Sequence, residues 1–224
     1  MLNNTHNQWE IYAELYKAYL DDADDRVSFV QVFPRILNSF GEVRGKRILD
    51  LGCGQGRFSR AFHDLGAEVT AYDFSPGEIE IARSLDDGRE ISYSSDKESF
   101  ENTNYYDLTL CSMVLLCNPP KKAFQLVQTI YNCLAQDGFA CFVNTNTGKL
   151  GCRFKDFFSE PPAESKQGVP YKTIIPTSKG ELVVTDYYYS PEHLKNLFFS
   201  AHFEMEHEEI ISQQFVFHML RKNG

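Results

Sequence analysis

The segment whose residue types and spacing best suit binding chemistry is a glycine-rich turn between Asp50 and Gly56. It reads Asp-Leu-Gly-Cys-Gly-Gln-Gly and begins inside a short apolar run at 47–51. Glycines in such a turn let the backbone approach a ligand closely, and the N–H groups of a following helix favour a negative group. A ligand-binding loop is therefore predicted here, accompanied by a second acid, Asp73, at the end of the next apolar run.

The glycine spacing distinguishes between two kinds of nucleotide. The dinucleotide fingerprint G-x-G-x-x-G, started at Gly52, requires a glycine where this chain has Arg57. Asp50 at the mouth of the turn would repel a pyrophosphate but suits a ligand that carries a cation. Asp73 is placed to accept hydrogen bonds from both hydroxyls of a ribose. S-adenosylmethionine carries a sulfonium, an ammonium, one carboxylate and a ribose, and is the predicted cofactor.

The flanking sequence predicts the elements that position these acids. Strands are expected at 47–51 and 68–72, and apolar residues at helical spacing follow each of them. The second helix is expected to open with Ser75 as N-cap, Pro76 in the first turn and Glu78 closing a capping box. This strand–helix alternation is typical of a parallel, doubly wound sheet.

Five further strands complete the predicted sheet, at 91–93, 108–116, 139–143, 203–211 and 215–220. The last two are joined by a short polar turn, which makes them an antiparallel pair. The fold class is therefore α/β, with a Rossmann-like, doubly wound, mostly parallel seven-stranded sheet whose last strand is antiparallel. Outside the sheet we expect a helical cap at 1–40 and an insertion at 147–189 that contains a β-hairpin, all within one domain spanning 1–224.

Composition restricts the partners. The chain has 224 residues and a formal net charge of −9, whereas a protein that binds nucleic acid through its phosphates needs a basic face. No apolar run approaches the roughly 18 residues of a membrane span. The six cysteines form no C-x-x-C pair and lack zinc-ligand spacing. We therefore expect a cytoplasmic monomer or homodimer that binds no metal, nucleic acid or membrane.

Four segments resemble class I S-adenosylmethionine-dependent methyltransferases. RILDLGCGQGRFSR (47–60) is similar to their first motif and VTAYDFSPGEIEIAR (69–83) to their second. Residues 106–146 resemble the fourth strand, the following helix and the fifth strand. Residues 187–209 resemble the closing helix and strand of the small-molecule group related to ubiquinone-pathway (type 11) methyltransferases. The resemblance implies a methyltransferase with a small-molecule substrate.

The resemblance also implies roles for individual residues at the cofactor. The methionine part would be lined by Asp50, Gly52, Cys53, Gly54 and Gly56. Asp73 would hold the ribose. Phe74 would flank the adenine, and Asp96 would meet the amino group of the adenine. Ser112 and Met113 would face the adenosine or the methyl group. A solvated loop acid at Asp96 and an ordinary core ring at Phe74 are the alternatives.

The acceptor side is less defined by the sequence. Aromatic residues make up 14% of the chain, and many of them fall in the N-terminal segment and the insertion, where a ring-lined pocket suits a small, partly aromatic or apolar acceptor. The predicted pocket residues are Tyr12, Tyr16, Asn144, Tyr187 and Tyr188; packing onto the sheet is the alternative for the first two.

No catalytic base is identified from the sequence. Asn118-Pro119-Pro120 is interpreted as a helix start rather than the N-P-P-Y motif of amide methyltransferases, and Leu116-Cys117 stands where a related family often has a histidine. O- or N-methylation is expected. A nucleotide-dependent oxidoreductase and a non-catalytic cofactor-binding subunit or regulator remain as alternatives.

Overall fold

A computed structural model gives the architecture. It describes Trp9, Ala13, Leu15, Lys17 and residues 27–101, 104–154 and 157–223, with no side-chain detail for Val27 and Ser28. Within these residues no helix has the length and apolar character needed to cross a membrane. Most of the first 26 residues of the helical cap predicted at 1–40 therefore lie outside the described residues.

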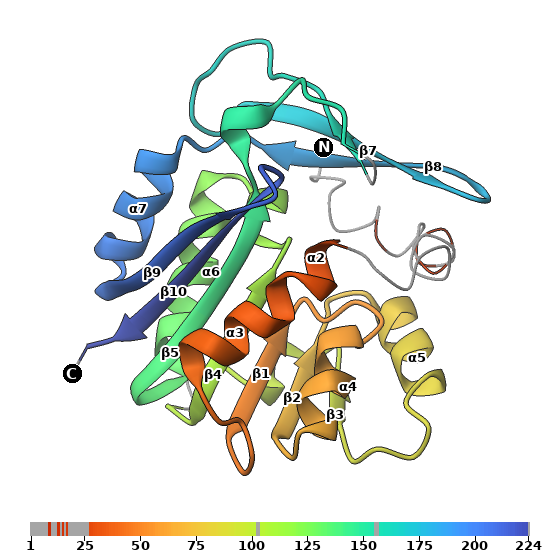
Figure 1. Cartoon of the computed structure of the whole chain (residues 1–224), viewed down its shortest axis with the longest axis vertical. Helices are drawn as coiled ribbons and strands as arrows, with labels where there is room; N and C mark the ends of the chain where they lie inside the picture. Colours follow the sequence, from red (N-terminus) through yellow and green to blue (C-terminus); the bar gives the residue numbers. More distant parts are fainter. Residues whose placement is uncertain are drawn as a thin grey trace.

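A central sheet of seven strands forms the middle layer (Figure 1). Its strands are β1 (Arg47–Leu51), β2 (Glu68–Tyr72), β3 (Ser92–Ser94), β4 (Tyr106–Ser112), β5 (Leu134–Thr145), β9 (Phe203–Ile211) and β10 (Phe215–Lys222). They lie in the order β3-β2-β1-β4-β5-β10-β9. β10 pairs antiparallel with both β5 and β9, whereas β1 to β5 pair in parallel. The predicted fold class is confirmed.

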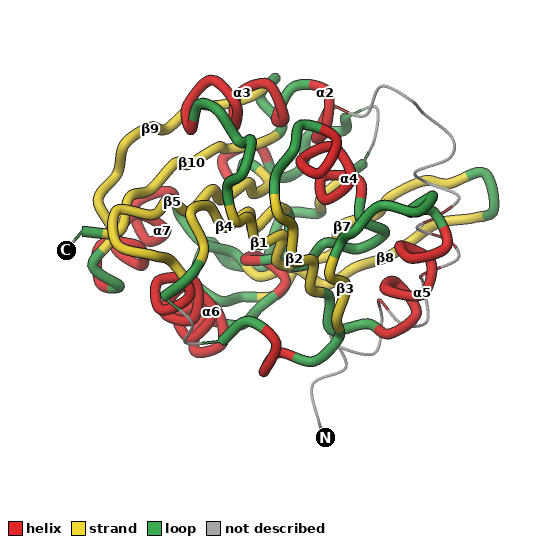
Figure 2. Tube along the Cα trace, turned by 90° about the horizontal axis from the view of Figure 1, so that it is seen from below, coloured by secondary structure: helices red, strands yellow, loops and turns green. Residues whose placement is uncertain are grey.

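Helices cover both faces of this sheet (Figure 2). They are α2 (Val27–Val30), α3 (Val32–Phe40), α4 (Arg57–Asp64), α5 (Pro76–Ser84), α6 (Pro120–Cys133) and α7 (Pro191–Ser200). Ile36 of α3 and Phe62 of α4 are buried in one core with Ile48 of β1. Val127 of α6 and Phe198 of α7 are buried in a second core with Leu49, the next residue of β1. Neighbouring residues of one strand thus point into two cores, as a sheet covered on both faces requires.

A small antiparallel sheet crosses the carboxyl ends of the parallel strands (Figure 1). It consists of β6 (Phe158–Ser159), β7 (Pro170–Thr177) and β8 (Gly180–Tyr187), with β7 and β8 joined as a hairpin. This confirms the hairpin predicted within the insertion. The insertion therefore supplies a roof over the edge of the sheet where ligands bind in doubly wound folds.

Three details of the prediction are wrong. The fifth strand begins at Leu134 rather than at 139 and ends at Thr145 rather than at 143. The fourth strand ends at Ser112 rather than at 116, because Met113 adopts a left-handed φ of 61° and Leu115–Cys117 form a 3₁₀ turn, η2. The side chains of Leu115 and Leu116 are nevertheless buried, so the apolar run reports burial and not strand geometry. At α5, Ser75 does accept a hydrogen bond from the Glu78 N–H, but its own N–H donates to Asp73, so the Glu78 side chain does not close a capping box there.

Candidate functional site

The glycine turn after β1 is held in an unusual backbone path. Gly52, Gly54 and Gly56 have φ values of 77°, 49° and 76°, all in the left-handed region that side chains disfavour. The N–H groups of Gly52 and Cys53 both donate to the Tyr72 carbonyl, at 2.7 and 2.9 Å. A Cβ atom on Gly52 would overlap the Val114 side chain. The turn therefore requires glycine at position 52 for both conformation and space.

Asp73 joins this turn to the start of α5. Its Oδ2 accepts the Gly54 N–H at 2.9 Å, and its Oδ1 accepts the Ser75 N–H at 3.0 Å. The side chain is largely buried at the end of β2. Because a carboxylate can accept more than one hydrogen bond at each oxygen, Asp73 positions two backbone turns and can still accept from a ligand.

Asp50, at the end of β1, is a buried acid with a perturbed pKa. It is 2% exposed, and burial raises its pKa to about 6. The Ser59 hydroxyl donates to Asp50 Oδ2 at 2.5 Å and lowers the pKa, whereas the negative charge of Asp73 raises it. Two carboxylates at neighbouring strand ends thus repel each other, and a cation placed between them would relieve that repulsion.

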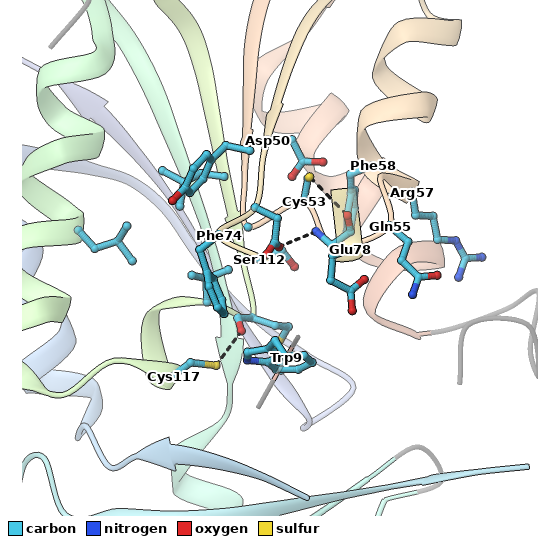
Figure 3. Close-up of a pocket in the computed structure, with 18 of the residues that line it drawn as sticks. Trp9, Asp50, Cys53, Gln55, Arg57, Phe58, Phe74, Glu78, Ser112 and Cys117 are labelled. Carbon is cyan, nitrogen blue, oxygen red and sulfur yellow. Dashed lines mark hydrogen bonds between the residues drawn. The ribbon is translucent and has the colours of Figure 1, made fainter. Parts of the chain in front are cut away.

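These residues open onto a cavity of about 270 Å³ at the carboxyl ends of the strands (Figure 3). Most of the predicted cofactor residues line it: Asp50, Gly52, Cys53, Gly54, Asp73, Phe74, Ser112 and Met113. They lie at or just after the carboxyl ends of β2, β1 and β4, which are neighbours in the sheet. The sheet therefore brings them together, while their individual roles at the cofactor stay predictions.

The other two predicted cofactor residues lie off the cavity lining. Gly56 is the left-handed N-cap of α4, where a Cβ atom would come within 2.6 Å of the Tyr93 hydroxyl. Asp96 is exposed and accepts the Glu98 N–H at 3.0 Å as N-cap of η1 (Lys97–Ser99). Gly56 thus shapes the helix start behind the turn, and Asp96 is engaged as a helix cap.

The predicted acceptor residues that the structure describes, Asn144, Tyr187 and Tyr188, do not line the cavity either. Asn144 is fully buried at the end of β5, and Tyr187 packs partly buried against the core that contains α6 and α7. The backbone N–H of Tyr188 donates to Val169 in the insertion. Tyr12 and Tyr16 lie outside the described residues. Their roles at an acceptor stay predictions, and other side chains line the cavity among the described residues.

Three aromatic side chains line the cavity, those of Trp9, Phe29 and Phe58. Trp9 belongs to the N-terminal segment whose rings were expected at the acceptor, whereas the sequence did not single out Phe29 and indicated Phe58 only as a helix-spaced apolar residue. Glu78, which is 2% exposed, and Cys117 also line it, at positions interpreted as a helix cap and as a departure from a related family. Asn118 lines the cavity as well, and the predicted helix start is confirmed by α6, which begins at Pro120.

Comparison with known proteins agrees with this geometry. Residues 48–138 match the model of a family described as a methyltransferase domain. A ubiquinone biosynthesis O-methyltransferase of Xanthomonas euvesicatoria is 37% identical over 79 residues, which are 33% of this chain and 33% of that protein. The chain spans between a third and about half of the length of the curated relatives it matches.

Solved structures resemble nearly the whole chain. An S-adenosylmethionine-dependent methyltransferase from Mesorhizobium loti superposes with a TM-score of 0.64 at 19% identity, covering 88% of this chain and all of that one. A 1,6-didemethyltoxoflavin-N1-methyltransferase from Burkholderia thailandensis gives 0.63 at 17% identity, covering 100% of this chain and 92% of that one. These structures show the fold, and the match over residues 48–138 shows a methyltransferase domain within it, so the chain is similar to the class I S-adenosylmethionine-dependent methyltransferases.

Proposed function

We propose that this chain transfers a methyl group from S-adenosylmethionine to the oxygen or nitrogen of a small, partly aromatic acceptor. The observation that carries the proposal is the cavity that joins the left-handed glycine turn and two buried acids to a wall of aromatic side chains. The first part suits the cofactor, and the second suits an acceptor that contains a ring.

The residues at the strand ends fit the cofactor. Gly52 and Gly54 present backbone without side chains to the cavity, so a ligand can approach closely. The raised pKa of Asp50 indicates a carboxylate whose charged form would be stabilised by a nearby cation. Asp73 keeps acceptor capacity for the ribose, and Phe74 offers a ring for the adenine. When bound, S-adenosylmethionine supplies the methyl group on its sulfonium sulfur.

The acceptor wall is aromatic. Trp9, Phe29 and Phe58 line the cavity, and the Phe29 and Phe58 ring centroids are 5.0 Å apart. Rings of this kind bind flat apolar surface and hold it in a limited set of orientations. The curated relatives are named O-methyltransferases, and one solved structure is an N1-methyltransferase of a ring compound. These names support an oxygen or nitrogen acceptor atom.

The residues of the chain contribute mainly by orientation and by exclusion of water. Among the described residues that line the cavity there is no histidine, and the titratable groups are acids, cysteines, one tyrosine (Tyr72) and one arginine. Alignment of the attacking atom with the methyl group can supply much of the rate enhancement of a displacement. An acceptor that ionises near neutral pH, or a neutral amine, needs no strong base.

Two measurements test the proposal. Calorimetry with S-adenosylhomocysteine and with NAD should show binding of the first only, and binding of NAD alone would overturn the cofactor assignment. Transfer of labelled methyl from S-adenosylmethionine should then be followed on a panel of small phenols and heteroaromatic amines. Tight cofactor binding without transfer to any member would instead favour a binding subunit that kept the fold.

We also propose a localisation, an oligomeric state and a class of partner for this protein. We place it in the cytoplasm as a monomer or homodimer whose partner is a small molecule rather than a nucleic acid or membrane, in line with its net charge of −9. Light scattering on the purified chain measures the oligomeric state directly.

A further inference from the structure

A buried polar cluster connects the small sheet to the wall of the cavity. The Thr173 hydroxyl of β7 donates to Asp186 Oδ2 of β8 at 2.7 Å, and it also shares a hydrogen bond with Ser159 of β6 at 2.8 Å. The Cys117 thiol, from the turn after β4, approaches Asp186 Oδ1 at 3.4 Å. One carboxylate thus receives a donor from its own sheet and a second donor from a cavity-lining residue.

Burying the carboxylate of Asp186 costs free energy, because the charged form loses its contact with water. The side chain is 5% exposed, and burial raises its pKa, against the effect of the hydrogen bonds from Thr173 and Cys117. Its cross-strand neighbour is Tyr171, whose buried hydroxyl has no hydrogen-bond partner among the described residues. Removing a partner of a buried carboxylate is costly, because the group then lacks a hydrogen bond in surroundings that exclude water.

The conformation that Asp186 contacts is the turn at 113–118. Met113 has a left-handed φ of 61°, which is strained for a residue with a side chain. The Cys117 thiol lies 3.3 Å from the Met113 carbonyl oxygen as well as near Asp186. The Asn118 amide donates to the Val114 carbonyl at 2.9 Å. Four residues of this turn, Met113, Val114, Cys117 and Asn118, line the cavity.

The insertion holds this turn at two points. Beside the contact from Asp186, the Tyr189 hydroxyl donates to the Asn118 carbonyl at 2.6 Å. Tyr189 is itself fully buried, and the Thr147 hydroxyl donates to its carbonyl at 2.7 Å. The strained turn is therefore fixed from outside the central sheet, by residues about 70 positions further along the chain.

We propose that Asp186 is a positioning residue for methyl transfer, which acts through Cys117 to hold the 113–118 turn in the shape that lines the cavity. The inference deepens the proposed function and depends on it for its catalytic part. Asp186 does not line the cavity among the described residues, so its effect is exerted on the turn and not by contact with the cofactor.

The test replaces Asp186 with a side chain of similar size that accepts no hydrogen bond. In Asp186→Leu, alkylation of Cys117 by iodoacetamide should accelerate by about tenfold, the factor that one hydrogen bond to a charged group contributes. Peptide mapping separates Cys117 from the exposed Cys152. Amide hydrogen exchange should accelerate at 113–118, while affinity for S-adenosylhomocysteine stays within about twofold, as expected for a substitution remote from the ligand.

Rescue distinguishes positioning from general loss of structure. Asp186→Asn keeps an acceptor oxygen and should return alkylation and exchange toward the wild-type rates. The matched control is Glu181→Ala, an exposed acid on the same strand, which should change neither rate. If Asp186→Leu does not fold, Cys117→Ala removes the same contact from the other side and should accelerate exchange at 113–118.

The outcomes separate this inference from the proposed function. Unchanged exchange at 113–118 in both Asp186→Leu and Cys117→Ala would overturn it, whatever the protein catalyses. Failure of the wild-type chain to bind S-adenosylhomocysteine would overturn the proposed function and leave the structural role measurable. With a phenol or amine that the wild type methylates, Asp186→Leu should lower kcat by about tenfold with little change in KM for S-adenosylmethionine, and an unchanged kcat would reject the catalytic part.

Discussion

Two of the walls of the cavity are built by different means. On the wall formed by the ends of β1 and β2, the contacts are mostly to the backbone: Asp73 accepts two N–H groups, and the Tyr72 carbonyl accepts two more. On the wall formed by the 113–118 turn, side chains of the insertion supply the contacts, through Asp186 and Tyr189. The first wall is local in sequence, whereas the second joins segments 69 and 71 residues apart.

This difference has a consequence for specificity. A wall made by backbone conformation suits the cofactor, which stays the same whatever the acceptor is. Few substitutions are tolerated there, because most of them alter the path of the chain. A wall held by side-chain hydrogen bonds can be altered one residue at a time while the central sheet stays intact. We therefore expect cofactor binding to be sensitive at few positions and acceptor choice to be adjustable at many.

Gly52→Ala should break this division most strongly, because Gly52 is where the two walls touch. An alanine would be strained at a φ of 77° and would overlap Val114 of the opposite wall. Affinity for S-adenosylhomocysteine should fall by about 100-fold, or roughly 3 kcal/mol. Calorimetry measures the loss. Gly45→Ala is the matched control: its φ is 68° but nothing lies within 4 Å of its Cβ position, so it should leave affinity unchanged.

The pH dependence of cofactor binding tests whether the ionised Asp50 carboxylate, in the wall formed by β1 and β2, contributes to that binding. Because the pKa of Asp50 is about 6 in the free protein, a ligand cation that prefers the ionised carboxylate should bind more tightly as pH rises through 6. Affinity for S-adenosylhomocysteine at pH 5 should be about tenfold lower than at pH 7.5. A titration by calorimetry in buffers of constant ionic strength measures it.

Asp50→Asn provides the control for this dependence. This variant should bind S-adenosylhomocysteine more weakly at pH 7.5, and its affinity should not change between pH 5 and 7.5.

The same carboxyl group also affects stability. The folded-state pKa of Asp50 lies above the ordinary value of 3.8, so the wild-type carboxyl group favours the folded state most below pH 4 and loses that contribution as pH rises through 6. Thermal unfolding of the free protein should therefore show less decline with rising pH in Asp50→Asn. A wild-type affinity that did not change with pH would contradict the assignment.

Tyr189→Phe tests the side-chain-built wall. The substitution leaves the ring buried but removes the donor to the Asn118 carbonyl, which should cost about 1 to 2 kcal/mol in the free energy of unfolding. Chemical denaturation measures this change. Cofactor affinity should be affected much less than in Gly52→Ala. Equal losses of cofactor affinity in the two variants would show that the walls are not independent.

Ser75→Ala has the smallest expected effect and lies on the cofactor side. It removes the oxygen that accepts the Glu78 N–H at the start of α5, which should cost about 1 kcal/mol of stability. Ser84→Ala, at the exposed end of the same helix, is the control. A decrease in cofactor affinity beyond about twofold would show that the helix start, and not only Asp73, orders the glycine turn.

The local wall is also the part that the sequence predicts well. Asp50 and Asp73 end apolar runs, and runs of that kind predict parallel strands whose carboxyl ends share one edge of the sheet. Ser75-Pro76 predicts a helix start from residue types alone. Since these signals lie within a few residues of the atoms they position, the predicted residues Asp50, Gly52 and Asp73 do meet at one cavity.

The wall formed by the 113–118 turn could not be predicted from local sequence patterns. The pairing of Cys117 with Asp186 has no periodicity, and each residue alone resembles an ordinary core cysteine or strand acid. The apolar residues Leu115 and Leu116 are buried as their type predicts, but the pattern does not predict the left-handed Met113 that turns the chain out of β4. Phe29 and Phe58 lie on helices as predicted, yet which face of each ring meets a cavity depends on how α2 and α4 pack together.

The position of β10 also has a consequence for how the molecule is made. This strand lies between β5 and β9, although it follows both of them in the chain. Phe217 and Leu220 of β10 are fully buried, one in each of the two main cores. During synthesis, β5 must therefore wait with an unpaired edge until residues 215–222 have emerged. Chaperone dependence and aggregation should be greatest in that interval, before the long-range pairing closes the sheet.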